Sequence, residues 1–179
     1  MNAKMLIAGF GGQGVLFAGK FLVFAGMLIG KDISWLPAYG PEMRGGTANC
    51  SVILSDESIG SPIVDKPDIL IALNLPSLDK FEDMVVSDGH IFINSSLINR
   101  LSHRIDAVSY YCPATRIADE NGLPGLANMV MLGHVVAHYN LYPMEVLAES
   151  MKKLITGRKK EMYDKNMEAL KLGMKYQPL

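Results

Sequence analysis

Cysteine and charge are both scarce in this sequence. Its 179 residues include only two cysteines, Cys50 and Cys112, too few for a disulfide framework or for a cluster held by four thiolates. Charged residues make up 20% of the chain and hydrophobic residues 49%, whereas typical domains carry roughly 25% charged residues. This balance excludes a disordered chain, and we expect part of the surface to be covered by a partner.

An excess of positive charge and a long apolar run are also missing. Lysine and arginine number 17 against 18 aspartate and glutamate, so the net charge of −1 gives no positive field to hold a nucleic acid. The most apolar stretch, residues 15–29, contains Lys20 and is shorter than the about 20 residues of a membrane-spanning helix. The pattern of a signal peptide is not found either. We therefore expect a cytoplasmic protein that binds neither nucleic acid nor membranes.

The hydrophobic pattern favours an α/β fold. The chain begins with a short apolar run at residues 5–8, which is followed by a set of glycines. A helix-length segment at 15–29 is apolar on nearly every face, and a second short apolar run follows at 33–36. This order is typical of a βαβ unit with a right-handed crossover. Residues 47–55 alternate as in a strand near a sheet edge, whereas 69–73 and 90–93 resemble central parallel strands.

The last third of the chain has helical periodicity, over residues 126–139, 143–155 and 159–172. The length suits one domain, and the sequence contains no internal repeat and no linker. We predict a single α/β domain over residues 1–179, with a Rossmann-like, mostly parallel sheet and a helical C-terminal part.

The strongest local motif is a set of three glycines between the first strand and the first helix. Gly9, Gly11 and Gly14 match the pattern G-x-G-x-x-G. Such glycines permit a tight turn and let a ligand approach the backbone, while the N–H groups of the following helix favour a phosphate. An NAD site also needs an acid at the end of the second strand, and Asp32 precedes that strand. The glycines therefore indicate either an anionic ligand or only close packing of helix and strand.

A second motif is the loop of residues 39–46, which is rich in glycine and proline and has no periodicity. It contains Glu42 and Arg44, and an arginine offers a planar fork that matches a carboxylate or a phosphate. The alternative is that the two side chains form ion pairs that fix the loop or an interface.

Other reactive side chains do not assemble into a site by their spacing. His134 and His138 share one helix face, but zinc needs at least one more ligand, and Val135 stands where a metalloprotease has glutamate. We interpret the two histidines as packed residues and both cysteines as buried, inert thiols. No catalytic triad and no carboxylate pair is evident, so we predict no catalytic residue and no metal ligand in this chain.

These motifs together resemble those of a known family. The runs 9–15, 39–47 and 61–64, with Pro67-Asp68, are similar to the gamma subunit of 2-oxoacid:ferredoxin oxidoreductases. The same similarity covers Leu73-Asn74 with Pro76-Ser77, Asn128 and Gly133, in order over nearly the whole chain. Residues 43–50 most resemble the 2-oxoglutarate type, which forms succinyl-CoA, with the branched-chain 2-oxoacid and pyruvate types as close competitors.

The resemblance implies a complex that decarboxylates a 2-oxoacid on thiamine diphosphate, passes electrons through iron–sulfur clusters to ferredoxin or a similar acceptor, and transfers the acyl group to coenzyme A. Because this chain has so few thiolates, the thiamine diphosphate, Mg and iron–sulfur clusters are implied for alpha and beta subunits and for a ferredoxin-like delta subunit where one is present.

The same resemblance implies a role for the two loops of this chain. The chain would shape the entrance for coenzyme A, with Gly11, Gly12, Gln13 and Gly14 as a backbone cradle and Arg44 as an anion contact. One alternative is a free-standing nucleotide-binding α/β protein, either a dehydrogenase or a sensor. The other is an assembly module without any ligand contact.

Overall fold

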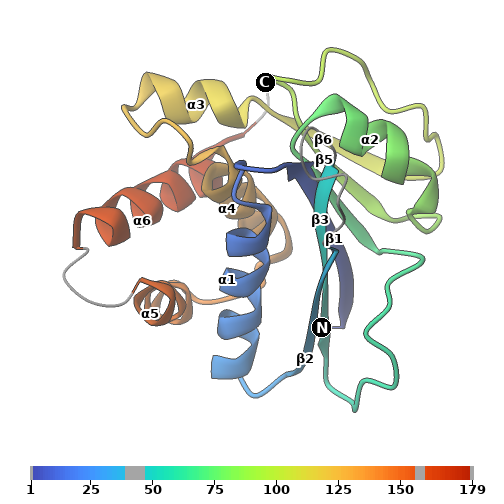
Figure 1. Cartoon of the computed structure of the whole chain (residues 1–179), viewed down its shortest axis with the longest axis horizontal. Helices are drawn as coiled ribbons and strands as arrows, with labels where there is room; N and C mark the ends of the chain where they lie inside the picture. The colour runs from blue at the N-terminus through green and yellow to red at the C-terminus, as the bar shows by residue number, and fades with distance from the viewer. Residues whose placement is uncertain (1, 39–46, 156–159, 178–179) are drawn as a thin grey trace.

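The computed structural model describes residues 2–38, 47–155 and 160–177, which form one six-stranded sheet with helices on both faces (Figure 1). The strands are β1 (Ala3–Phe10), β2 (Asp32–Ala38), β3 (Thr47–Ser55), β4 (Ile69–Ala72), β5 (His90–Asn94) and β6 (Val108–Cys112). The helices are α1 (Val15–Leu28), α2 (Leu75–Phe81), η2 (Glu82–Met84, a 3-10 turn), α3 (Ala114–Glu120), α4 (Ala127–Tyr139), α5 (Met144–Leu154) and α6 (Lys160–Lys175). No helix in these ranges is long and apolar enough to cross a bilayer.

The sheet has the order β2-β3-β1-β4-β5-β6. Strands β1, β4, β5 and β6 are parallel neighbours, and β3 runs antiparallel between β1 and β2. The predicted α/β class with a mostly parallel sheet is confirmed. The expected βαβ unit differs in one respect, because β3 lies between its two strands and β2 becomes the edge. Only residues 39–46 join β2 to β3, and an antiparallel pair can form across so short a connection.

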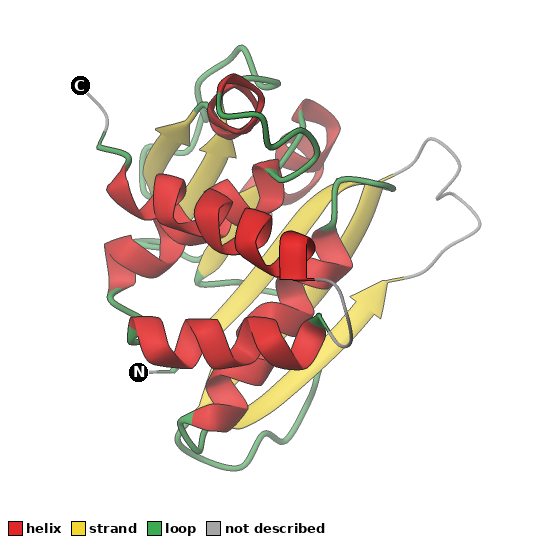
Figure 2. Cartoon of the chain, turned by 90° about the vertical axis from the view of Figure 1, so that its left-hand side faces the viewer, coloured by secondary structure: helices red, strands yellow, loops and turns green. Residues whose placement is uncertain are grey.

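Two apolar cores lie on the two faces of the sheet. Helices α1, α3, α4, α5 and α6 cover one face, and α2 with η2 covers the other (Figures 1 and 2). Successive strand residues point to opposite faces, so Met5 and Ile7 of β1 pack under the larger helical layer, whereas Leu6 and Ala8 pack under α2. The continuous apolar runs of the central strands follow from this double burial.

The helical layer is held together by an unusually close crossing of α4 and α6. A Cβ atom added at Gly133 would lie 2.0 Å from the carbonyl oxygen of Leu170, and one added at Gly173 would lie 1.8 Å from that of Val130. Only residues without a Cβ allow two helix backbones to approach this closely. The crossing therefore fixes α6 against α4, whose first turn contributes to the site described next.

Candidate functional site

The candidate site lies where the carboxyl ends of β1 and β4 meet. The helix after β1 packs on one face of the sheet, and the helix after β4 packs on the other (Figure 1). A crevice opens at such a topological switch point in α/β sheets, and ligands commonly bind there. The glycine loop, residues 11–14, follows β1 directly into this crevice.

The backbone of the glycine loop requires glycine at two positions. Gly12 has a φ of 96°, and Gly14, the N-cap of α1, has a φ of 72°. Residues other than glycine rarely adopt these left-handed backbone conformations. A Cβ atom at Gly14 would also lie 2.4 Å from Nδ2 of Asn128, so the loop and the first turn of α4 are in direct contact.

The loop leaves the N-terminus of α1 open. The first bond of the helix runs from the Ala18 N–H to the Gly14 carbonyl, over 2.9 Å, so the N–H groups of Val15, Leu16 and Phe17 precede any intrahelical partner. Gly14 offers no side-chain cap, and the first turn has no acidic residue. Together with the helix dipole, these N–H groups favour an anion. A hollow of about 310 Å³ lies against them, lined by Phe10, Gly11, Gly12, Gly14, Val15, Leu16, Phe17 and Ala48.

The side chain of Gln13 closes the loop from within. Its Oε1 accepts from the Phe10 N–H at 2.6 Å and from Asn74 Nδ2 at 3.0 Å, and its Nε2 donates to the Leu73 carbonyl at 3.4 Å. The amide thus ties the loop to the end of β4. A direct contact between Gln13 and a ligand stays a prediction, and the open groups at this loop are those of the backbone.

A second polar network supports the loop from the ends of β4 and β5. The buried Asn94 donates from Nδ2 to the Leu73 carbonyl at 3.2 Å and to Thr115 Oγ1 at 2.9 Å, and its Oδ1 accepts from the Thr115 N–H at 3.3 Å. Asn74 accepts from the Ser77 N–H at 2.9 Å and caps α2. Sequence reasoning assigned neither asparagine to the site, although Asn94 is the last residue of β5 and Asn74 follows the end of β4 by two residues.

A narrower cavity of about 150 Å³ opens on the other side of the loop. Its walls are mainly apolar, and Asp119 is its one charged residue in the described ranges. The lining residues are Gly12, Gln13, Leu73, Leu97, Thr115, Ala118, Asp119, Gly125 and Ala127.

Asn128 leaves an acceptor without a partner beside the loop. The residue is 5% exposed, and its Nδ2 donates to the Gly14 carbonyl at 3.1 Å. Its Oδ1 is buried and accepts no hydrogen bond from the described residues. Buried polar atoms are rarely left unpaired, and no donor for this oxygen is found in ranges 2–38, 47–155 and 160–177. The groups that the site presents are therefore the N–H groups at the start of α1, whereas the unpaired oxygen of Asn128 is buried and lines neither hollow.

The predicted site residues are only in part brought together. Gly11, Gly12 and Gly14 line the hollows beside α1, whereas Arg44 lies outside the described residues. The strands that flank residues 39–46 are described, and Thr47 at the start of β3 pairs with Phe10 at the end of β1. Thr47, the first residue of β3, therefore lies at the same end of the sheet as the start of the glycine loop.

Acid–base and metal chemistry find little support in the described residues. Burial raises the pKa of both thiols, Cys50 and Cys112, to about 12, so they are neutral at physiological pH. No three His, Cys, Asp or Glu side chains within ranges 2–38, 47–155 and 160–177 are grouped to hold a metal ion. His134 is buried among aromatic rings, as its interpretation as a packed residue predicts. His138 is exposed, although its ring lies against that of Tyr110. At the glycine loop, the N–H groups at the start of α1 suit the binding of an anion.

Comparison with known proteins identifies the family. A family model described as pyruvate ferredoxin/flavodoxin oxidoreductase matches residues 4–176. The chain belongs to this family. The resemblance drawn from the sequence motifs is thereby confirmed at the level of the family.

Relatives within the family differ in name and in length. The ketoisovalerate oxidoreductase subunit VorA of Methanothermobacter thermautotrophicus is 42% identical over 98% of this chain, which spans only 36% of that relative. This chain likewise spans only 28% of the length of VorA from Methanothermobacter marburgensis. The 2-oxoglutarate synthase subunit KorC of Methanocaldococcus jannaschii is 37% identical over 97% of this chain and is covered to 92% of its own length.

Solved structures of this family share the fold. The gamma subunit of a keto/oxoacid ferredoxin oxidoreductase from Geobacter sulfurreducens matches with a TM-score of 0.81 and 25% identity, over 96% of this chain and 95% of that one. A 2-oxoglutarate:ferredoxin oxidoreductase chain from Magnetococcus marinus matches with a TM-score of 0.86 at 22% identity, over 97% of this chain and 30% of that one. This second likeness shows the fold alone.

Proposed function

We propose that this chain is the gamma-type subunit of a 2-oxoacid:ferredoxin oxidoreductase complex. The complex would convert 2-oxoglutarate and coenzyme A to succinyl-CoA and CO2, and pass the two electrons to ferredoxin. The observation that carries the proposal is the family match over residues 4–176. The choice of 2-oxoglutarate is supported by KorC relatives, which this chain covers over 92–95% of their length for the three methanogen proteins.

In this proposal the chain contributes binding and not redox chemistry. Thiamine diphosphate, Mg and the iron–sulfur clusters would be supplied by alpha, beta and delta subunits, because two buried, neutral thiols cannot ligate a cluster. We further propose that residues 1–179 act as one α/β domain in the cytoplasm.

The proposed ligand of this chain is coenzyme A. Its phosphates suit the open N-terminus of α1, where the residues from Val15 to Phe17 line the hollow beside Gly11 and Gly14 and their N–H groups have no intrahelical partner. Arg44 would add a fork for a phosphate oxygen.

Reconstitution tests this proposal. The chain is combined with its neighbouring subunits and assayed with coenzyme A, ferredoxin and each of three acids: 2-oxoglutarate, pyruvate and 3-methyl-2-oxobutanoate. We expect coenzyme A-dependent reduction of ferredoxin that is fastest with 2-oxoglutarate and absent when any subunit is omitted. Activity of this chain alone, or micromolar binding of NAD(H), NADP(H) or FAD, would instead support a free-standing nucleotide-binding protein.

A second candidate keeps the reaction and changes the acid. The VorA relative is 42% identical to this chain, against 37% for KorC of Methanocaldococcus jannaschii. This difference favours 3-methyl-2-oxobutanoate as the alternative substrate, and the assay above distinguishes the two by their kcat/KM values.

A further inference from the structure

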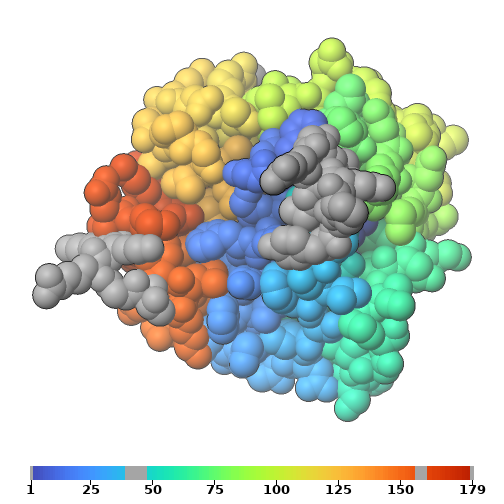
Figure 3. All heavy atoms as spheres, in the orientation of Figure 1, coloured from blue at the N-terminus to red at the C-terminus, as the bar shows by residue number. Residues whose placement is uncertain are grey.

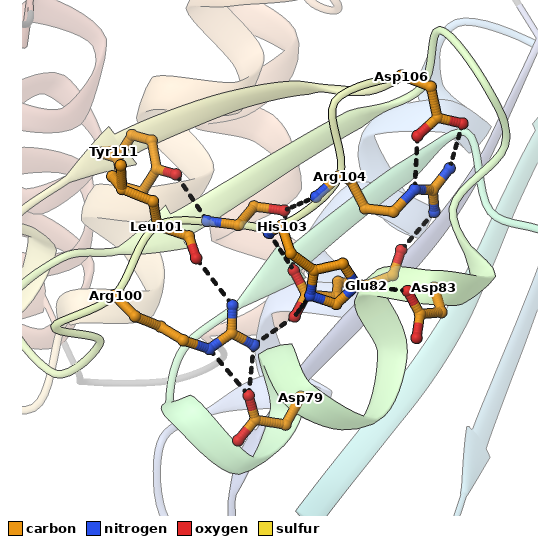
Figure 4. Close-up of polar contacts among 10 residues, drawn as sticks. Asp79, Glu82, Asp83, Arg100, Leu101, His103, Arg104, Asp106 and Tyr111 are labelled. Carbon is orange, nitrogen blue, oxygen red and sulfur yellow. Dashed lines mark hydrogen bonds and ion pairs between the residues drawn. The ribbon is translucent and has the colours of Figure 1, made fainter.

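The connection between β5 and β6 crosses the α2 face of the sheet without a helix. Parallel neighbours such as these are usually joined through an α-helix, but here residues 95–106 form no helix and no strand. We call this segment the strap. It lies against α2, η2 and β6, and polar contacts hold it there (Figure 4).

The carboxylate of Glu82 is the centre of these contacts. Its side chain is fully buried and receives the guanidinium of Arg100, the hydroxyl of Ser102 at 2.8 Å and the N–H of His103 at 3.4 Å. Its backbone carbonyl accepts from Arg104 Nη1 at 2.7 Å. A buried carboxylate that loses its partners is strongly destabilising, so the strap is held in one conformation.

This fixed strap carries large aliphatic side chains on its solvent side. Leu97 is 46% exposed, Leu101 74% and Ile105 101%, at intervals of four residues. Solvent-exposed positions of a connecting loop are usually occupied by polar or turn-forming residues. Aliphatic side chains on a backbone that is already ordered lose little entropy on association, which favours a protein interface.

The charges around the strap indicate the partner's chemistry. Three acids are among the most exposed members of the network, with Asp83 at 72%, Asp79 at 54% and Asp106 at 46%. The basic members are His103, whose side chain is 57% exposed, and Arg100 and Arg104, at 33% and 13%. The aliphatic groups of the strap therefore share this face with exposed carboxylates, one on the strap itself and two on α2 and η2. A complementary surface is an apolar depression edged by lysine or arginine. In the space-filling view the strap lies beside α2 at the upper right, so such a contact could extend over both (Figure 3).

We propose that the strap is the docking surface for a partner subunit of the oxidoreductase complex, whose contacting face is an apolar depression bordered by lysine or arginine. The proposal rests on the proposed function. It is supported by the VorA relative, in which the sequence matched by this chain is only 36% of a longer polypeptide and so has further protein attached. Leu97 also lines the 150 Å³ cavity, so a partner on the strap would border the candidate site.

The test places charge on the strap in the complete complex. The variant L101D/I105D changes two exposed side chains, so its circular dichroism and Tm should match the parent chain. The control is Met162→Asp, at a 46% exposed methionine of α6, on the other face of the sheet (Figure 1). We expect the tagged L101D/I105D chain to recover at least about tenfold less of the thiamine diphosphate-binding subunit. M162D should recover it as the parent does.

Each other outcome counts against a specific statement. If L101D/I105D and M162D both recover the partner normally, the strap is not the docking surface and the proposed function stands. If the parent chain recovers no thiamine diphosphate-binding subunit under any salt condition, the proposed function itself fails. If sedimentation shows that L101D/I105D converts a dimer of this chain to a monomer, the strap binds a second copy and the proposal is overturned.

Discussion

Single residues at the glycine loop differ in which of their groups remain free. Gln13 uses both ends of its amide inside the chain, so it shapes the loop. Asn128 uses only Nδ2, on the Gly14 carbonyl, and keeps Oδ1 without a partner among the described residues. A side chain next to a ligand site is thus better judged by its unused hydrogen-bonding groups than by its place in a motif.

The proposed anion contact at Arg44 can be tested by kinetics. In the reconstituted complex, Arg44→Ala should raise KM for coenzyme A by about 10- to 100-fold, because a hydrogen bond to a charged group contributes about 1.5–3 kcal/mol. The kcat value should change little. Arg44→Lys keeps the charge but loses the planar fork, so its KM should lie between the two. An assembled R44A complex with an unchanged KM would remove this contact from the proposal.

Elements meet most closely at the crossing of α4 and α6, and this makes a stability prediction. In an isolated helix, Gly→Ala stabilises by up to about 1 kcal/mol. Gly173→Ala should do the opposite and destabilise the chain by at least about 1–3 kcal/mol, because its Cβ would meet the Val130 carbonyl at 1.8 Å and backbone cannot move aside.

Urea denaturation measures this change in the free energy of unfolding. Lys171→Ala, at an exposed position of the same helix, is the matched control and should stay within about 0.5 kcal/mol of the parent. If G173A were as stable as the control, the close crossing would be wrong.

Some of these elements can be predicted from the sequence, whereas their order in the sheet cannot. The apolar runs of β4 and β5 and the glycines before α1 predict an α/β sheet with a tight glycine loop, because burial on both faces and positive φ values leave direct traces in residue type. The insertion of β3 leaves no such trace, since strand order depends on contacts between distant segments. The meeting of Asn94 with Thr115 and the network around Glu82 are likewise products of the tertiary fold.

The whole molecule should lose stability in mild acid through its histidines. Burial, together with the charge of His138, lowers the pKa of both His90 and His134 below 6.5. The unfolded chain then binds more protons than the folded one once the pH falls below about 6.5. The free energy of unfolding should therefore be highest above that pH and fall as the pH drops toward the folded-state values.

Denaturation curves between about pH 7.5 and about pH 5 measure this loss, whose slope is at most about 1.4 kcal/mol per pH unit for each histidine. His134→Gln should flatten the slope, because glutamine does not titrate. A profile that is the same with and without His134 would contradict the assignment.

The pairing of β1 with β3 has a consequence for how the two loops tolerate change. Eight residue pairs, from Ala3 with Leu54 to Phe10 with Thr47, join β1 to β3 and fix where the two loops begin. A longer loop would leave these residue pairs unchanged. Deleting one residue inside β3 would shift every later pair by one residue and turn the side chains of those residues to the opposite face of the sheet. The distance between the starting points of the two loops is therefore set by the sheet and not by the loops themselves.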